Sequence, residues 1–171
     1  MNRQIHIQYY KTNIGELILG SFESKLCILD FRYRKLRTIV DARVKKILGA
    51  EFVEQDDELL KKTRKQIDEY LEGKRKMFDL PIIMAGSDFQ KRVWEALLNV
   101  PYGATATYQD IARIVSNEKA VRAVAGANGA NAIALIIPCH RIVGSNGMPG
   151  GYSGGVVVKK RLIQLEKTGL L

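Results

Sequence analysis

Three short segments rich in β-branched and aromatic side chains occupy the first 31 residues, and they constrain the fold more than any other feature of the sequence. They cover residues 4–10, 16–22 and 26–31. A Thr-Asn-Ile-Gly turn signal separates the first two segments, as expected for neighbouring strands joined by tight connections. We therefore expect an antiparallel β-meander. Cys27 alternates with the other residues of the third segment, which predicts a thiol packed in the core.

The spacing of apolar residues becomes helical after this region. A basic stretch can carry a helix over residues 36–47, and residues 57–71 place apolar side chains at helical spacing, with a basic face that we expect to be solvated. Residues 74–83 then predict an extended connection. We place a domain boundary near residue 85, so that residues 1–85 form the N-terminal domain.

The remaining residues, 86–171, predict a mainly helical domain. Ser87 begins a capping-box pattern, and the apolar residues after it share one helical face, which predicts Trp94 in the core. Two further short helices around a tight turn are expected over residues 107–127, which is the helix-turn-helix arrangement. The predicted fold class is therefore α+β, with a β-meander domain followed by a mainly helical domain with a helix-turn-helix.

The second helix of this pair has a surface almost free of bulky side chains. Small residues, among them Ala123, Gly126 and Ala127, surround Arg122. Small side chains let a backbone approach another surface closely, either a neighbouring helix or DNA. On DNA, Arg122 would insert among stacked bases or bind a phosphate, whereas its alternative role is a surface ion pair.

The chain is basic, with 27 Lys and Arg against 18 Asp and Glu and a formal net charge of +9. Residues 1–85 hold 17 basic and 13 acidic residues, and residues 86–171 hold 10 and 5, so the excess is spread over both parts. A basic surface attracts polyanions, of which nucleic acid is the commonest inside cells. The charge therefore favours a nucleic-acid partner without requiring one.

Membrane and metal-binding classes are disfavoured. The longest apolar run, residues 132–137, is far shorter than the roughly 18 to 20 residues that span a bilayer, and no apolar core of a signal peptide occurs near the start. We expect no membrane partner and a cytoplasmic location. Two cysteines and two histidines make neither a disulfide framework nor a zinc site of about four ligands. We expect no metal and no cofactor.

Cys139 lies in the segment with the clearest chemistry. Residues 132–137 predict a buried strand that runs directly into a Pro-Cys-His-Arg sequence. A thiolate is a nucleophile, and an adjacent imidazole and guanidinium favour its formation. Six glycines within residues 144–155 predict a loop that forms a pocket wall, and the last helix carries Glu166, a carboxylate able to orient His140.

Together these residues resemble the O6-alkylguanine-DNA alkyltransferases, also called methylated-DNA–protein-cysteine methyltransferases. The resemblance rests on Pro-Cys-His-Arg-Ile at 138–142, preceded by Asn131 and followed by Gly-Tyr-Ser-Gly-Gly at 151–155, and it extends over residues 86–167. It implies an active-site loop over residues 138–155. The β-rich first part is similar to the ribonuclease-H-like N-terminal domain of this family in the order of its elements.

The resemblance implies direct-reversal DNA repair, in which Cys139 takes the alkyl group from guanine O6 irreversibly and each protein molecule reacts once. It also implies that His140 deprotonates the thiol through water, that Glu166 polarises His140, and that the loop is braced by a further residue, Asn131. Tyr108 matches a position that contacts a phosphate, helps to rotate the nucleotide and supplies a proton to guanine N3.

The implied partner is double-stranded DNA that contains O6-alkylguanine. Guanine O6 lies inside the base pair, so a cysteine reaches it only when the nucleotide is flipped out. The family inserts its small-residue helix into the minor groove, with Arg122 in the vacated place. The residues expected at the base pocket are Tyr152, Ser153, Lys159 and Trp94. We expect a monomer that binds DNA independently or cooperatively.

Two other functions stay open at this point. A non-catalytic sensor of alkylated DNA is one, although the lesion-binding branch of the family has a tryptophan in place of the cysteine, so Cys139 disfavours it. A cysteine hydrolase built on Cys139 and His140 is the other, but it would need a histidine distant in sequence, and His6 is an unpromising candidate. Some relatives hold a zinc ion in the N-terminal domain, which His6 and Cys27 alone cannot bind.

Overall fold

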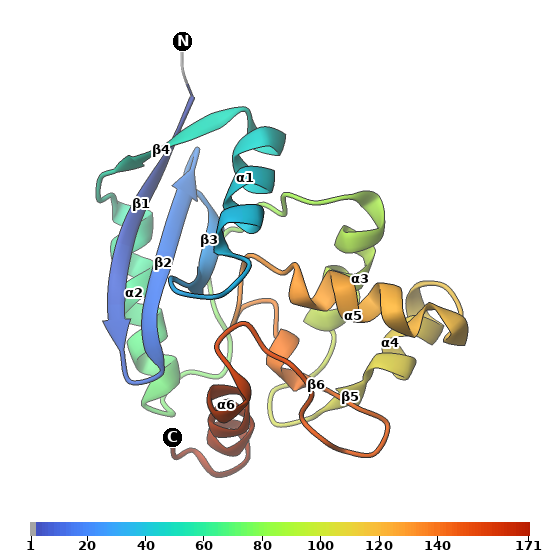
Figure 1. Cartoon of the computed structure of the whole chain (residues 1–171). Coiled ribbons are helices and arrows are strands. Elements are labelled where there is room, and N and C mark those ends of the chain that lie inside the picture. Colours follow the sequence, from blue (N-terminus) through green and yellow to red (C-terminus); the bar gives the residue numbers. More distant parts are fainter. Residues whose placement is uncertain (1–2) are drawn as a thin grey trace.

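The first part of the chain forms a four-stranded sheet with two helices, shown on the left of Figure 1. The computed structural model describes residues 3–171. The elements of this part are β1 (Arg3–Thr12), β2 (Gly15–Phe22), β3 (Lys25–Phe31), α1 (Arg37–Leu48), β4 (Ala50–Glu54) and α2 (Glu58–Leu71). The strand order is β3-β2-β1-β4. The first three strands are antiparallel neighbours, which confirms the predicted meander, whereas β4 adds a parallel edge strand that was not predicted.

The second part is mainly helical. Its elements are α3 (Asp88–Leu98), β5 (Ala106–Thr107), α4 (Tyr108–Val115), the 3₁₀ helix η1 (Glu118–Ala120), α5 (Val121–Gly129), the 3₁₀ helix η2 (Cys139–Arg141), β6 (Ile142–Val143) and α6 (Val156–Thr168). Helices α3, α4 and α5 pack against one another (Figure 1). The α+β fold class predicted from the sequence is confirmed.

Local capping signals fix where several helices begin. The side chains of Ser87 and Thr107 each accept a hydrogen bond from the backbone N–H three residues later, and their own backbone N–H groups donate to the side chain of that residue, so α3 and α4 both begin with a capping box. Asp57 caps α2 by accepting from the Leu60 N–H. The predicted helices therefore begin within one or two residues of their expected positions.

The prediction of a buried strand over residues 132–137 is correct about burial and wrong about the conformation. The segment forms turns, and its link to the sheet is a single bridge between Ile133 and Leu29. The Asn131 side chain explains this conformation, because it accepts from the Ile133 N–H and donates to the Ile137 carbonyl, at 2.9 Å each. The segment therefore folds around Asn131 instead of extending along a neighbouring strand.

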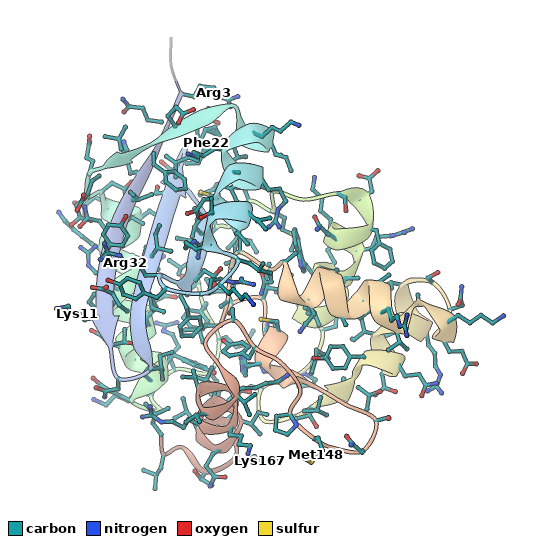
Figure 2. All side chains as sticks on the ribbon, viewed as in Figure 1. Arg3, Lys11, Phe22, Arg32, Met148 and Lys167 are labelled. Carbon is teal, nitrogen blue, oxygen red and sulfur yellow. The ribbon has the colours of Figure 1, made fainter. Side chains whose placement is uncertain are left out.

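The two parts share one apolar core and several polar links. The Leu29 N–H donates to the Ala132 carbonyl, and Arg43 of α1 donates to the carbonyls of Ala85 and Ala130. The labelled basic side chains Arg3, Lys11 and Lys167 lie at the outer edge of the molecule in Figure 2. Across residues 3–171, no helix has the length and apolar character needed to cross a membrane.

Candidate active site

Cys139 begins η2 and lines a cavity of about 810 Å³ between the two parts of the molecule. The other lining residues are residues 33–36 of the first part, Tyr108, Ala125, Asn128, Gly129 and residues 151–155. Residues 33–36 follow β3, Tyr108 is the first residue of α4, and residues 151–155 precede α6. The cavity is thus built by loops, helix ends and one side of α5, which the fold brings together from distant parts of the sequence.

The Cys139 side chain is almost inaccessible, at 3% exposure. Burial raises the pKa of its thiol to about 11, although a hydrogen bond from Asn131 opposes the increase. The thiol is therefore protonated at neutral pH, and a nucleophilic role requires a base within reach.

His140 follows Cys139 in the chain and is fully buried. Its Nε2 lies 2.6 Å from Oε2 of Glu166, and because a carboxylate only accepts, Nε2 is the donor. Burial lowers the pKa of His140, and Glu166 acts in the opposite direction. The Nδ1 atom is buried without a hydrogen-bond partner within residues 3–171. The neutral ring therefore has one basic nitrogen available.

Glu166 receives an unusual number of hydrogen bonds. Besides His140, the donors are Arg141 through Nε at 2.8 Å and through Nη2 at 3.0 Å, the Gly103 N–H at 3.2 Å and the Tyr70 hydroxyl at 2.5 Å. Burial alone would raise the pKa of Glu166, but these donors outweigh it and lower the pKa to about 2. Glu166 is therefore ionised at any physiological pH.

Tyr152 and Ser153 form part of the cavity wall. The Tyr152 Oη and Ser153 Oγ atoms are buried and lack a hydrogen-bond partner among the described residues. Phe31 supports this wall, since its ring meets that of Tyr152 edge-on at 5.5 Å, and a Cβ on Gly154 would lie 2.6 Å from it. A side chain at residue 154 would displace the Phe31 ring, which favours glycine there, and two polar side chains of this wall have no partner among residues 3–171.

Family models match almost the whole chain. The ribonuclease-like domain of 6-O-methylguanine DNA methyltransferase matches residues 5–83, and the DNA-binding domain of the same family matches residues 88–168. The chain belongs to this methyltransferase family.

Relatives and solved structures agree with the family assignment. The methylated-DNA–protein-cysteine methyltransferase of Methanosarcina barkeri is 40% identical over 157 residues, which cover 92% of this chain and 94% of the relative. That of Methanosarcina mazei is 43% identical over 160 residues, or 94% and 96%. The crystal structure of Mycobacterium tuberculosis OGT in complex with DNA has a TM-score of 0.82 at 35% identity and covers 96% of this chain and 94% of its own.

Most of the expected site residues of this methyltransferase surround one pocket. Cys139, Tyr108, Tyr152 and Ser153 line it, and His140, the residue after Cys139, donates to Glu166. Lys159 is fully buried behind the wall, where its Nζ donates to the Gly151 carbonyl at 3.1 Å and lies 5.9 Å from the Tyr108 ring. Burial lowers the pKa of Lys159 to about 8.

Two expected positions need correction. Trp94 lies outside the cavity, since its indole is buried under α5 and donates to the Ala127 carbonyl at 2.9 Å. Ala127 is itself 3% exposed and faces this core contact, so it is not part of the open surface of the helix. Arg122, Ala123 and Gly126 do face solvent, and Arg122 forms no ion pair within residues 3–171.

Two residues that hydrogen-bond Glu166 were not predicted from the sequence as site residues. Arg141 was noted only as a neighbour of the thiol, yet its guanidinium binds Glu166 and the Val100 carbonyl. Tyr70 lies in the helix predicted over residues 57–71 and was given no functional role, yet its hydroxyl donates to Glu166, 96 residues later in the chain. The motif around Cys139 contained the first signal, whereas no local pattern marks the second.

Proposed function

We propose that this methylated-DNA–protein-cysteine methyltransferase repairs O6-alkylguanine directly, by moving the alkyl group onto Cys139. The observation that carries the proposal is a buried thiol that lines a cavity and is followed in the chain by His140, which is hydrogen-bonded to Glu166. The unpartnered polar atoms of Tyr152 and Ser153 support the binding of a flipped guanine in the same cavity.

In the proposed reaction, Nδ1 of His140 takes the Cys139 proton through a bridging water molecule while Glu166 stabilises the imidazolium. The thiolate attacks the alkyl carbon, the S–C bond forms as the C–O6 bond breaks, and the electron pair stays on guanine. Tyr108 donates a proton to guanine N3, and Tyr108 then regains a proton from solvent. His140 releases the proton that it took from Cys139 to solvent. Burial raises the pKa of Tyr108, so that it is protonated when the base arrives. The thioether product has no route back to a thiol, so each molecule reacts once.

The DNA partner follows from the family and from the exposed face of α5. We propose that this face enters the minor groove, where Ala123 and Gly126 allow close approach and Arg122 fills the gap left by the flipped nucleotide. We also propose that residues 1–85 and 86–171 are the two domains, that the helix-turn-helix covers residues 107–127, and that a monomer binds the duplex.

The direct test is the intact mass of the protein after incubation with excess duplex that contains one O6-methylguanine. Transfer of a methyl group adds about 14 Da to the protein, and we expect one such adduct per chain at Cys139. An unchanged mass despite binding of the same duplex would favour a lesion sensor. Turnover of acyl substrates without a mass change would favour a hydrolase.

The role of Arg122 predicts a difference between two substrates. Arg122→Ala should slow repair of duplex DNA at least about tenfold, because flipping a nucleotide costs a few kcal/mol that the inserted side chain offsets. Its reaction with free O6-benzylguanine should be unchanged, since no base has to be flipped. Rates from quenched reactions on both substrates measure the difference.

Arg161→Ala is a matched control for the loss of one positive charge. Arg161 lies on α6, where it donates to the Asn13 carbonyl. This variant should repair duplex DNA at nearly the rate of the unmodified protein. Equal losses on both substrates in Arg122→Ala would show that Arg122 acts on the fold or the pocket instead of on flipping.

A further inference from the structure

Tyr70 places a group of the N-terminal domain in contact with the catalytic carboxylate. The residue lies near the end of α2 and is fully buried. Its hydroxyl is 2.5 Å from Oε2 of Glu166 and 3.4 Å from Nε2 of His140. The mechanism described above uses Glu166 and His140 and assigns nothing to this third group.

We propose that Tyr70 is a positioning residue for the alkyl transfer. Its hydroxyl holds Oε2 of Glu166 where that atom accepts the Nε2 proton of His140, and this keeps Nδ1 as the basic nitrogen that the proposed reaction uses. The inference rests on the proton transfer proposed for His140. It adds that the N-terminal domain sets the reactivity of the cysteine, in addition to supporting the pocket wall.

The hydroxyl is a fixed donor. Burial, with the nearby negative charge of Glu166, raises the pKa of Tyr70 well above its ordinary value, so the phenol keeps its proton. Its ring packs against Phe78 at a centroid distance of 5.3 Å and against Tyr102 at 6.3 Å. These contacts leave the hydroxyl little freedom, and a donor held in this way determines where the carboxylate oxygen lies.

Arg141 and Tyr70 both donate hydrogen bonds to the carboxylate of Glu166, with different effects. Arg141 donates to both oxygens of Glu166 and anchors the group as a whole. Oε2 also accepts from Tyr70 at 2.5 Å and from His140 at 2.6 Å, whereas the Arg141 bond to it is longer, at 3.0 Å, so Tyr70 makes the closest contact with the oxygen that determines the histidine tautomer. Removal of the hydroxyl should therefore weaken the orientation of His140 while the carboxylate stays bound.

The test compares Tyr70→Phe with Tyr10→Phe. Tyr10 is a close chemical match, because its hydroxyl also donates to a carboxylate of α2, that of Asp68, but at an exposed site. The first readout is the rate of reaction with free O6-benzylguanine, which does not depend on DNA binding. We expect Tyr70→Phe to react about tenfold more slowly than the protein without substitutions, and Tyr10→Phe to react at the same rate as that protein.

The second readout is the histidine tautomer, observed by long-range ¹H–¹⁵N NMR. The chain has two histidines, and His6→Gln assigns the signals of His140. We expect the unmodified protein to show His140 protonated at Nε2 alone, and Tyr70→Phe to show a mixture of the two tautomers. A purely structural hydrogen bond would change the melting temperature without changing this ratio.

Glu166→Gln separates failure of the inference from failure of the mechanism beneath it. If Glu166→Gln reacts slowly and Tyr70→Phe reacts at the rate of the protein without substitutions, the role of Tyr70 alone is overturned. A slower Tyr70→Phe with an unchanged His140 spectrum would also overturn it, because positioning would not be the cause. Unmodified rates in both variants would overturn the proton transfer through His140 itself.

Discussion

Cys139→Ala is expected to abolish alkyl transfer completely while the affinity for alkylated duplex DNA stays within about twofold, because phosphate contacts supply most of that affinity. The thiol is 3% exposed and contributes little to the surface that meets DNA. Intact mass after incubation with an O6-methylguanine duplex measures transfer, and fluorescence anisotropy of the labelled duplex measures binding. We expect the Cys139→Ala variant to bind the lesion without any gain in mass.

Cys27→Ala is the matched control, since the chain has two cysteines. Cys27 lies within β3 at 1% exposure, outside the cavity, and burial raises the pKa of its thiol to about 12. This variant should gain one alkyl group as the unmodified protein does. Transfer retained by Cys139→Ala would show that the acceptor is misassigned, and lost DNA affinity would show that the thiol supports the binding surface.

Local sequence signals predicted the elements well because the interactions that form them are local. The capping residues Ser87 and Thr107 satisfy backbone groups three residues away, so their effect can be recognised without knowledge of the fold. The failed strand at 132–137 shows the limit of such signals. Apolar composition predicted burial correctly. However, Leu135 adopts a positive φ of 70°, and the Ile133 N–H donates to the Asn131 side chain instead of to a neighbouring strand.

Tertiary contacts account for the other differences. The edge strand β4 is short and carries Glu51 and Glu54, so its pairing with β1 left no recognisable alternation. Ala127 was expected on the open face of α5, but the indole of Trp94 bonds its carbonyl and turns that side toward the core. A small residue fits either a core contact or a groove, and composition does not distinguish between them.

The same reasoning applies to the site. The motif around Cys139 and its family resemblance indicated His140 and Glu166, which the fold brings to 2.6 Å. Tyr70 belongs to a helix that is separated from Glu166 by most of the chain, and at the level of sequence it is one more apolar position of an amphipathic pattern. A polar role for a residue on the buried face of a helix emerges only when its partner is known.

Glu166→Gln is expected to reduce both activity and stability. Breaking a buried ion pair by neutralising one partner typically costs about 3 kcal/mol of unfolding free energy, and here the amide would face both Arg141 and the Tyr70 hydroxyl. Transfer to free O6-benzylguanine should slow about a hundredfold, because His140 would lose the charge that stabilises its protonated form. Denaturant unfolding and single-turnover rates measure the two effects.

The loss of stability should depend on pH in a direction fixed by Glu166. Its pKa is about 2 in the folded protein and 4.5 ordinarily, so the carboxylate stabilises the fold above about pH 4.5, and this contribution disappears as the pH falls toward 2. The difference in unfolding free energy between the two proteins should therefore shrink over that range. Glu95→Gln, at an exposed position of α3, should match the unmodified protein at every pH. A difference for Glu166→Gln that stayed constant from neutral pH to pH 2 would mean that packing, not the charge of the carboxylate, accounts for the lost stability.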